Sequence, residues 1–305
     1  MYKNYSISIC LCTYNGKKFI SELLNSIFRQ TLLPDEIIVC DDNSSDNTLE
    51  IIYSQAILHK NIKWKIFRNT ENKGWKINFH SAISKAEGDL IFLCDQDDIW
   101  DENKIKVMAS YWNEDILVLT CNVTQFFPNK KIPVIRYSVN NTFDIDKIEN
   151  KFDLLYCKRP GCSFCISNKI VTLYNSSWKH NFAHDRLLWM LAFLKGGLYK
   201  INYNGVLYRR HGDNASYINY QKFSKTKRRV YFENINLSRE YIESILKTND
   251  DNYINVNPIV DRLVERQPGV TRYTLRRTVT KVIELNGGER INPRGVYRVE
   301  KILKN

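Results

Sequence analysis

Residues 1–125 alternate between short apolar runs and segments with the periodicity of a helix. The apolar runs predict strands at residues 7–12, 36–40, 62–67, 89–94 and 116–121. Between them, apolar residues recur every three to four positions and predict helices at 17–30, 49–58, 75–86 and 101–112. Short strands that alternate with helices of this length are typical of an α/β fold. We therefore expect a mostly parallel sheet with helices on both faces.

Three polar clusters each follow one of these expected strands directly. They are Thr13-Tyr14-Asn15-Gly16, Asp41-Asp42-Asn43-Ser44-Ser45-Asp46 and Asp95-Gln96-Asp97-Asp98. Ligands of parallel α/β sheets bind beyond the carboxyl ends of the strands. Because all three clusters fall at such ends, we expect them to contribute to one site.

The acidic cluster at residues 95–98 is a candidate cation site. Asp95 and Asp97 are two positions apart, so on an extended segment their carboxylates would point the same way and share one ion. Carboxylate oxygens suit Mg²⁺ or Mn²⁺, which often bind one or two carboxylates together with substrate phosphates. The alternative is an acidic loop that caps the helix expected near Asp101. The position at a strand end favours the cation site.

Two further pairs of neighbouring residues, Asp41-Asp42 and His184-Asp185, have both a functional and a structural interpretation. Helix capping does not require Asp41 and Asp42, because the residues after them already offer capping side chains. An acid at a strand end can instead accept a hydrogen bond from a ribose hydroxyl or a base N–H. His184 and Asp185 open a helix expected near residues 184–195. Asp185 is there either a first-turn acid that complements the helix dipole or a general base near the site. The residues alone leave these two interpretations open.

The segment Tyr208-Arg209-Arg210-His211 is polar and follows an apolar pair, Val206-Leu207. Two arginines and a histidine in a loop could bind a diphosphate. A single histidine is more often structural, and taken alone His211 has that interpretation. Cys162 and Cys165 form a C-x-x-C without a second pair at zinc spacing, so we expect ordinary packing there.

Taken together, the motifs at residues 13–15, 41–46, 95–98 and 184–185 resemble, in order and spacing, those of inverting family 2 glycosyltransferases. The resemblance covers residues 5 to about 220 and implies the GT-A fold, a Rossmann-like, mostly parallel sheet flanked by helices. Three stretches are most similar to a rhamnosyltransferase-like branch: Cys94-Asp95-Gln96-Asp97-Asp98-Ile99-Trp100, His184-Asp185 and Tyr208-Arg209-Arg210-His211.

The resemblance implies a donor-side role for each matching residue. Asp42 would contact the nucleotide base, and Asp95 would lie near the ribose. Asp97 would bind the metal, with His211 close to the metal or the diphosphate. The other residues of the implied donor pocket are Thr13, Tyr14, Asn15, Asn72, Gly74, Asn78 and Gln96.

On the acceptor side, the resemblance implies that Asp185 is the catalytic base. Gly161 and Cys162 match a stretch near the acceptor. Many relatives carry Glu where this chain has His184. His184 would either shift the pKa of Asp185 or contact the acceptor.

The activity implied is that of a metal-dependent, inverting glycosyltransferase with Mg²⁺ or Mn²⁺ as cofactor. It would move a sugar, with rhamnose from dTDP-rhamnose as the first candidate, from a nucleotide-diphosphate donor to a hydroxyl of a surface polysaccharide or lipid-linked glycan. The alternatives are a UDP-hexose or UDP-N-acetylhexosamine transferase of the same fold, or a nucleotide-sugar binder without catalysis. The binder predicts that loss of Asp185 leaves every function intact.

Other classes of α/β protein fit the residues less well. A hydride-transfer enzyme would show G-x-G-x-x-G after the first strand, where this chain has Cys12-Thr13-Tyr14-Asn15-Gly16. The phosphate-binding motif G-x-x-x-x-G-K-[ST] of P-loop proteins is missing. A two-metal nuclease would not explain acids at two strand ends with Thr-Tyr-Asn at a third.

The positive charge divides the chain into two expected parts. Of the net charge of +12, residues 1–221 carry +4 and residues 222–305 carry +8. We expect a catalytic domain at 1–221 and a basic, mostly helical segment at 222–305 that matches no family motif. A basic helix with aromatic residues favours peripheral contact with an anionic membrane, and we expect no nucleic acid as partner.

The apolar residues also bear on location. No run approaches about 18 apolar residues, the length that would span a bilayer. The first residues show no signal-peptide pattern, and the sparse cysteines lie in apolar runs that suit a reducing compartment. We therefore expect a cytoplasmic protein, with peripheral contact at the inner face of the plasma membrane.

Overall fold

The computed structural model describes residues 5–127, 132–133, 142–149, 157, 159–180 and 182–212. The chain divides into two compact units, Met1–Tyr217 and Ile218–Asn305, and every described residue belongs to the first. The boundary expected at residue 221 and the helical, membrane-contacting segment expected beyond it lie outside the described residues.

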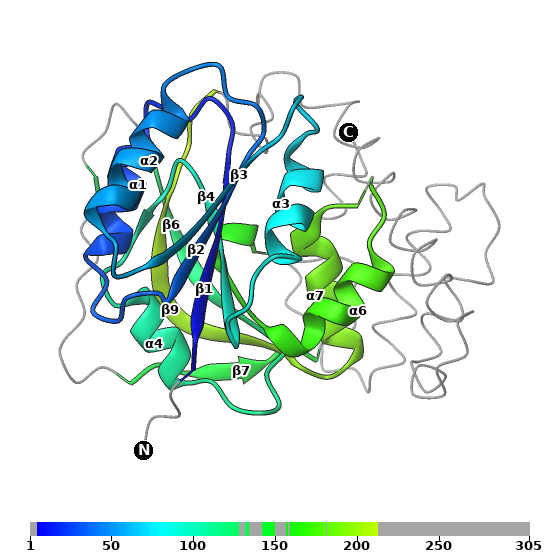
Figure 1. The fold of residues 1–305 in the computed structure, drawn as a ribbon. Helices are drawn as coiled ribbons and strands as arrows, with labels where there is room; N and C mark the ends of the chain where they lie inside the picture. The colour runs from blue at the N-terminus through cyan, green and yellow to red at the C-terminus, as the bar shows by residue number, and fades with distance from the viewer. Residues whose placement is uncertain are drawn as a thin grey trace, which may run out of the picture. The chain divides into compact units, whose positions relative to one another are not determined.

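Nine strands of the described residues form one sheet, in the order β3-β2-β1-β4-β8-β6-β9-β5, with β7 paired to β9 (Figure 1). Its first half is parallel: β3 (Lys63–Arg68), β2 (Glu36–Asp41), β1 (Ile7–Thr13) and β4 (Leu90–Asp95). These strands match the predicted ones to within a residue at most ends. The α/β fold with a parallel sheet is therefore confirmed for this half.

The second half of the sheet is mixed. Strand β8 (Phe164–Ser167) is antiparallel to both of its neighbours, β4 and β6 (Val118–Phe126). The long strand β9 (Leu198–Arg209) runs parallel to β6. Two short strands, β5 (Ile99–Trp100) and β7 (Ile145–Lys147), pair antiparallel with β9. Strand β9 thus returns to the region just after β4.

Helices cover both faces of the sheet (Figure 1). Helices α1 (Ile20–Phe28) and α2 (Thr48–Leu58) lie on one side. Helices α3 (Trp75–Ile83), α6 (Val171–Ser177) and α7 (His184–Leu194) lie on the other. The remaining short helices are α4 (Lys104–Ser110) and the 3₁₀ turns η1 (Gly161–Ser163) and η2 (Asn168–Ile170).

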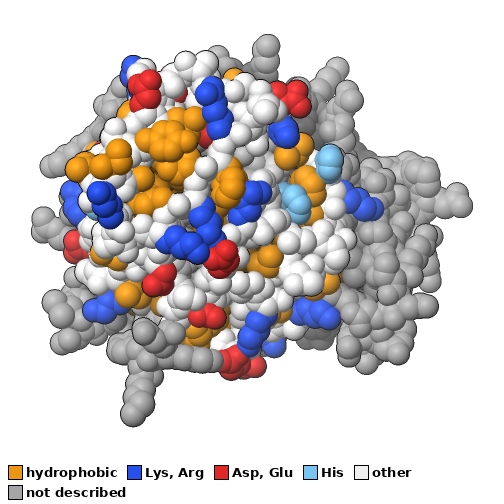
Figure 2. Space-filling view, viewed as in Figure 1, with side chains coloured by type: hydrophobic (Ala, Val, Ile, Leu, Met, Phe, Trp, Pro, Cys, Tyr) orange, Lys and Arg blue, Asp and Glu red, His pale blue; other side chains and the backbone are white. Residues whose placement is uncertain are grey.

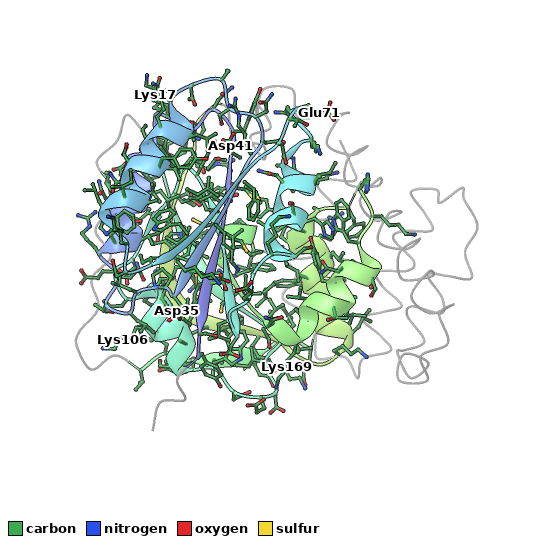
Figure 3. All side chains as sticks on the ribbon, in the orientation of Figure 1. Lys17, Asp35, Asp41, Glu71, Lys106 and Lys169 are labelled. Atoms are coloured by element: carbon green, nitrogen blue, oxygen red, sulfur yellow. The ribbon has the colours of Figure 1, made fainter. Side chains whose placement is uncertain are left out.

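The core forms because the central strands are apolar on both faces. Ile9 and Leu11 of β1 and Phe92 of β4 are fully buried between the helical layers. In α1, the residues Leu23 and Ile27 recur at helical spacing and are fully buried as well. Figure 3 shows side chains filling the space between the sheet and its helices.

One outer surface retains apolar side chains. Tyr53, Ile57 and Leu58 of α2 are each at least half exposed. Figure 2 shows hydrophobic side chains gathered over the side of α1 and α2. None of the described helices combines the length and the apolar character that a bilayer span requires.

Candidate active site

The three polar clusters meet at the carboxyl edge of the parallel strands. Strand register places Thr13 beside Asp41, and Cys12 beside Asp95. The ends of β1, β2 and β4 are therefore neighbours, as the sequence predicts. This edge is where ligands of parallel α/β sheets bind.

Thr13 and Asn15 hold the ends of β1 and β2 together. The buried Thr13 hydroxyl donates a hydrogen bond to Asp41 Oδ2 at 2.8 Å. Asn15 has a left-handed backbone (φ 47°), and its Oδ1 accepts from the backbone N–H of Ser45 at 2.8 Å. In return, the Asn15 N–H donates to Ser44 Oγ at 2.9 Å. Thr13 and Asn15, both predicted donor-pocket residues, therefore hold the end of β1 against the loop that follows β2.

Tyr14 is the exposed member of the same motif. Its backbone N–H donates to Gln96 Oε1, and Gln96 Nε2 donates to the Tyr14 carbonyl, both at 2.9 Å. These two hydrogen bonds, between the Gln96 amide and the Tyr14 backbone, join the end of β1 to the turn after β4. The aromatic ring of Tyr14 remains exposed, so it is available to pack against a planar ligand.

Asp42 is nearly fully buried and shapes the loop before α3. Its Oδ1 accepts from Asn69 Nδ2 and from the Lys73 N–H, and its Oδ2 accepts from the Gly74 N–H, all at 2.8 Å. Gly74 has φ +86°, a backbone conformation that other residues rarely adopt. Asn72 Oδ1 accepts from the same Gly74 N–H at 3.1 Å. An ionised carboxylate has about four acceptor positions, so about one remains for a ligand.

Asn78 supports this loop from behind. Its Nδ2 donates to the Cys40 carbonyl at 2.6 Å, and its Oδ1 accepts from Asn69 at 3.3 Å. The side chain is buried. Asn78 thus ties α3 to β2 beneath Asp42.

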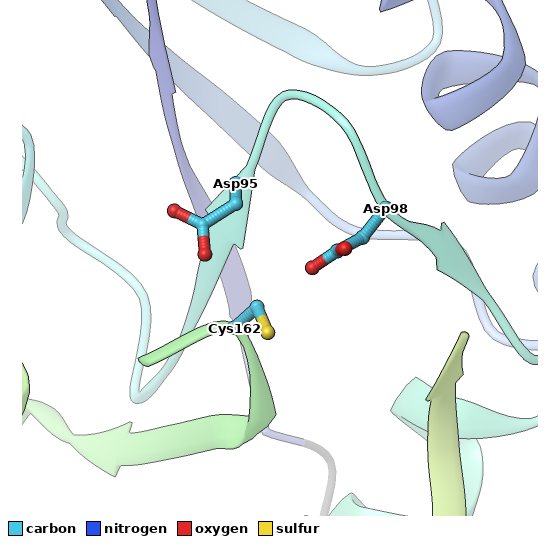
Figure 4. Close-up of side chains that lie close together, drawn as sticks. All are labelled: Asp95, Asp98 and Cys162. Carbon is cyan, nitrogen blue, oxygen red and sulfur yellow. The ribbon is translucent and has the colours of Figure 1, made fainter. Parts of the chain in front are cut away.

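The turn after β4 brings together Asp95, Asp98 and Cys162 (Figure 4). One ligand atom of each lies within 4.8 Å of the others. Burial, together with the charges of Asp97 and Asp185, raises the pKa of Asp95 to about 7. Burial also raises the pKa of Asp98 and of the Cys162 thiol. Asp95, Asp98 and Cys162 thus form one buried group, whose oxygen and sulfur atoms are close enough to share hydrogen bonds or a cation.

One expectation about this group is wrong. The strand ends at Asp95 and residues 96–97 form a turn, so Asp95 and Asp97 do not share an extended segment. Cys162 packs in the core, as expected, and its sulfur also lies beside two carboxyl groups (Figure 4). Alternation along a strand could not predict either result, since the chain turns and η1 arrives from a distant part of the sequence.

Asp97 instead pairs with His211. Asp97 Oδ2 and His211 Nε2 are 2.7 Å apart. The His211 ring packs against Phe19, with 4.7 Å between ring centroids. At this distance the two atoms hydrogen-bond to each other, and both are of types that ligate a divalent cation such as Mn²⁺. The structure thus joins the two residues predicted to lie at the metal.

Arg209 holds this pair in place, so the idea that it binds a diphosphate from a loop is wrong. It ends β9, and its Nε donates to the Asp97 carbonyl at 2.7 Å. Its side chain is only 6% exposed and forms an ion pair with Glu22. The guanidinium also lies 4.7 Å from the Phe19 ring centroid. Strand β9 continues further than the apolar pattern indicated, and it draws Arg209 into the interior.

His184, the first residue of α7, is 3% exposed and stacks on Phe79, with 3.8 Å between ring centroids. Within the described residues, neither of its ring nitrogens has a hydrogen-bond partner. Burial lowers the pKa of His184 to about 4, so its ring is neutral at pH 7. A Cβ on Gly161 would lie 2.6 Å from His184 Nε2, which explains why a glycine stands there.

Asp185 follows in the first turn of α7 and is half-buried. Its Oδ1 accepts from the Arg186 N–H at 2.7 Å. Its charge contributes to the raised pKa of Asp95, so the two carboxyl groups lie near each other. The predicted base therefore lies close to the acids that follow β4.

Trp75 lies beside the candidate site, although no motif of the sequence indicated it. It follows Gly74 as the first residue of α3 and is 41% exposed. Its ring meets that of His184 edge to face, with centroids 5.8 Å apart. An aromatic residue directly after the motif glycine was the available signal.

Comparison with known proteins identifies the family. The model of the family described as Glycosyl transferase family 2 matches residues 8–170. Two relatives match most of the chain. The UDP-Glc:alpha-D-GlcNAc-diphosphoundecaprenol beta-1,3-glucosyltransferase WfgD of Escherichia coli is 27% identical over 229 residues, 74% of this chain and 84% of its own. The dTDP-rhamnosyl transferase RfbG of Shigella flexneri is 26% identical over 263 residues, 80% of this chain and 86% of its own.

Solved structures share the fold. TarS of S. aureus, in complex with UDP-GlcNAc, has a TM-score of 0.61 at 20% identity, over 90% of this chain and 73% of that one. The mannosyltransferase PcManGT of Pyrobaculum calidifontis, in complex with GDP-Man and Mn²⁺, has a TM-score of 0.56 at 13% identity, over 98% and 80%. These likenesses support the glycosyltransferase α/β architecture. Since the family model covers more than half of the chain, the protein belongs to glycosyl transferase family 2 and is a glycosyltransferase.

Proposed function

We propose that this protein transfers a sugar from a nucleotide-diphosphate donor to a glycan hydroxyl, with inversion at the anomeric carbon. One observation carries the proposal: Asp97 with His211, Asp95 and Asp185 come together at the same sheet edge that Asp42 borders. In the proposed complex, Tyr14 and Asp42 contact the nucleoside. UDP-GlcNAc in TarS and GDP-Man in PcManGT support a nucleotide-sugar donor.

Asp185 acts in the proposed reaction as general base. A sugar hydroxyl is a weak nucleophile, and a positioned carboxylate can take its proton as it attacks the anomeric carbon. The bond to the diphosphate breaks as the new glycosidic bond forms, so one displacement inverts the centre. A second carboxylate nucleophile, which two-step retaining enzymes need, has no role in this route.

Asp97 and His211 would hold the divalent cation, Mn²⁺ or Mg²⁺. When bound, such an ion supplies positive charge beside the diphosphate leaving group. The oxygen and nitrogen donors of this pair suit Mn²⁺. The Mn²⁺ in the PcManGT complex supports this assignment.

We propose dTDP-rhamnose as the first donor to test, and a lipid-linked glycan as acceptor. The likeness to the dTDP-rhamnosyl transferase RfbG supports rhamnose. The likeness to WfgD favours a second candidate, UDP-glucose, and the acceptor in the name of WfgD supports a diphosphate-lipid-linked N-acetylglucosamine. The donor sugar, rather than the fold, separates these two functions.

Turnover of a panel of nucleotide sugars tests the proposal. The panel contains dTDP-rhamnose, UDP-glucose, UDP-GlcNAc and GDP-mannose, each with Mn²⁺, with Mg²⁺ and with EDTA. We expect one donor to release its nucleoside diphosphate only with metal, and Asp97→Ala and Asp185→Asn to abolish most of the release. Turnover that survives both substitutions would refute the site. Nucleotide binding without any turnover would favour a non-catalytic binder.

We also propose that the basic segment 222–305 places the enzyme at the inner face of the plasma membrane. The proposal is supported by the +8 charge of that segment and by the cluster of lysines and arginines at its start. The test replaces Lys225, Lys227, Arg228 and Arg229 by Gln in the full chain and measures sedimentation with phosphatidylglycerol vesicles. Binding equal to that of the unchanged chain would contradict the proposal, and neutral vesicles are the control.

A further inference from the structure

Lys104 is a lysine without solvent exposure. It is the first residue of α4, and its side chain is among the largest that are fully buried. Its Nζ donates to the Cys162 carbonyl at 2.8 Å and lies 3.3 Å from the centroid of the Trp100 ring. Within the described residues, no carboxylate forms an ion pair with it. Lys104 is therefore a buried cation held by one carbonyl and an aromatic face.

Such a residue is costly for folding. Removing an ammonium group from water carries a large penalty, which a close carboxylate usually offsets. Burial accordingly lowers the pKa of Lys104. An apolar side chain of similar size would fill the same space without this penalty. A reason for the charge must therefore lie in its surroundings: the Cys162 carbonyl, which accepts from Nζ, and the nearby charges of Asp95 and Asp98.

The group that Nζ contacts connects the two sides of the active site. Cys162 lies in η1, and its sulfur is within 4.8 Å of the carboxyl groups of Asp95 and Asp98 (Figure 4). A Cβ added to its neighbour Gly161 would lie 2.6 Å from His184 Nε2 and 3.4 Å from Asp185 Cβ, so Gly161 lies beside the start of α7. Turn η1 thus touches the donor-side acids with one residue and the start of α7 with the preceding one.

Turn η1 is buried and leads directly into β8, and its own hydrogen bonds are local. Ser163 donates to the Pro160 carbonyl from both its N–H and its hydroxyl, which closes the turn on itself. The bond from Lys104 instead ties η1 to α4, 58 residues away in the sequence. A charged donor also forms a stronger hydrogen bond than a neutral one.

We propose that Lys104 is a positioning residue, whose ammonium group fixes η1 and thereby the placement of Asp185 relative to Asp95. The inference rests on the function proposed above, because it assigns Lys104 to the alignment of that site. Lys104 itself touches neither donor nor acceptor in this proposal. Its loss should slow the chemical step more than it weakens nucleotide binding.

The test compares three substitutions in the full chain. Lys104→Met removes the charge and the donor at nearly equal volume. Lys104→Gln keeps an uncharged donor that is one bond shorter. Lys106→Met is the matched control, because Lys106 lies two residues further along α4 and is exposed (Figure 3). The probes are UDP and dTDP with Mn²⁺ for binding, and the donor that the unchanged enzyme turns over for rate.

For Lys104→Met we expect a melting temperature no lower than that of the unchanged protein, a nucleotide Kd within about threefold, and a kcat at least tenfold lower. Lys104→Gln should recover part of the rate, and Lys106→Met should match the unchanged enzyme. A folded Lys104→Met enzyme with full kcat would overturn the inference. Loss of folding in both Lys104 variants would overturn it too, since Lys104 would then serve stability alone.

Amide hydrogen exchange of residues 161–163 tests the same inference without turnover. We expect at least tenfold faster exchange in Lys104→Met and no change in Lys106→Met. Unchanged exchange would overturn the role of Lys104. Absence of turnover in the unchanged enzyme would instead refute the proposed function, so the two failures are distinguishable.

Discussion

The proposed donor side, at the ends of β1 and β2, and the proposed acceptor side, at the start of α7, differ in how their buried polar groups are satisfied. At the ends of β1 and β2, Thr13, Asn15 and Asp42 are bonded to neighbouring strands and loops. At the start of α7, both nitrogens of the buried His184 lack partners within the described residues, and the Trp75 ring is exposed beside it. Unpaired buried polar groups are costly, whereas a bonded network is already rigid.

Under the proposed function, the two sides therefore have different tasks. The donor side is built before any ligand arrives, which suits tight, oriented binding of a nucleotide. The proposed acceptor side instead has a buried histidine, His184, whose two ring nitrogens have no partner within the described residues and would be completed by a ligand. Substitutions on the acceptor side should therefore change rate or acceptor binding, and substitutions on the donor side should change nucleotide affinity as well.

The largest expected effect separates chemistry from binding. Asp185→Asn should lower kcat by about 10³-fold, because general-base catalysis contributes about 10²–10⁴-fold. The UDP Kd, measured by calorimetry with Mn²⁺, should stay unchanged. Asp146→Asn, an exposed acid of β7, is the control. An equal loss of UDP affinity in Asp185→Asn would break the division between the two sides.

The next effect belongs to the cation pair. Asp97→Ala or EDTA should lower turnover by about 10²-fold, and His211→Ala by about 10-fold, since loss of one supporting group typically costs about 10–100-fold. In contrast to Asp185→Asn, both variants should also weaken UDP binding in the presence of Mn²⁺. Unaltered Mn²⁺ dependence in Asp97→Ala would show that other residues bind the cation.

A third prediction concerns the pH dependence of folding stability. The pKa of His184 is about 4 in the folded protein, below the ordinary value of about 6.5. Between these values the unfolded chain binds a proton that the folded protein does not, so stability falls as pH falls. From pH 7 to pH 5 this residue should reduce the free energy of unfolding by about 2 kcal/mol.

Urea unfolding of the unchanged protein and of His184→Leu, each at pH 7 and pH 5, measures the contribution of His184 to the free energy of unfolding. The variant should lose about 2 kcal/mol less on acidification. Identical losses would mean that His184 finds a partner in solution, and the acceptor side would then be as satisfied as the donor side.

The smallest expected effect concerns Trp75. Trp75→Ala should raise the acceptor KM by roughly fivefold to tenfold, because a lost aromatic contact costs about 1 kcal/mol. Trp75→Phe, which keeps an aromatic face, should retain most of the affinity. The donor KM should not change. If it rises instead, the ring belongs to the donor side.

Much of the fold follows from local patterns in the sequence. The apolar runs predicted β1 to β4, and the positions of the polar clusters placed Thr13, Asp42 and Asp95 at one sheet edge. The start of α7 at His184 was also predictable. Periodicity sufficed because burial between two helical layers requires continuous apolar strands, and the carboxyl ends of parallel strands share an edge.

The partners of the site residues depended on the tertiary structure. His211 reaches Asp97 across 114 residues because β9 returns beside the turn after β4. The same return buries Arg209, which the sequence placed in a loop. The contacts of Lys104 with Cys162 and of Gly161 with His184 arise from packing between distant segments. Local patterns determine which elements form, whereas register and packing across the fold decide which side chains meet.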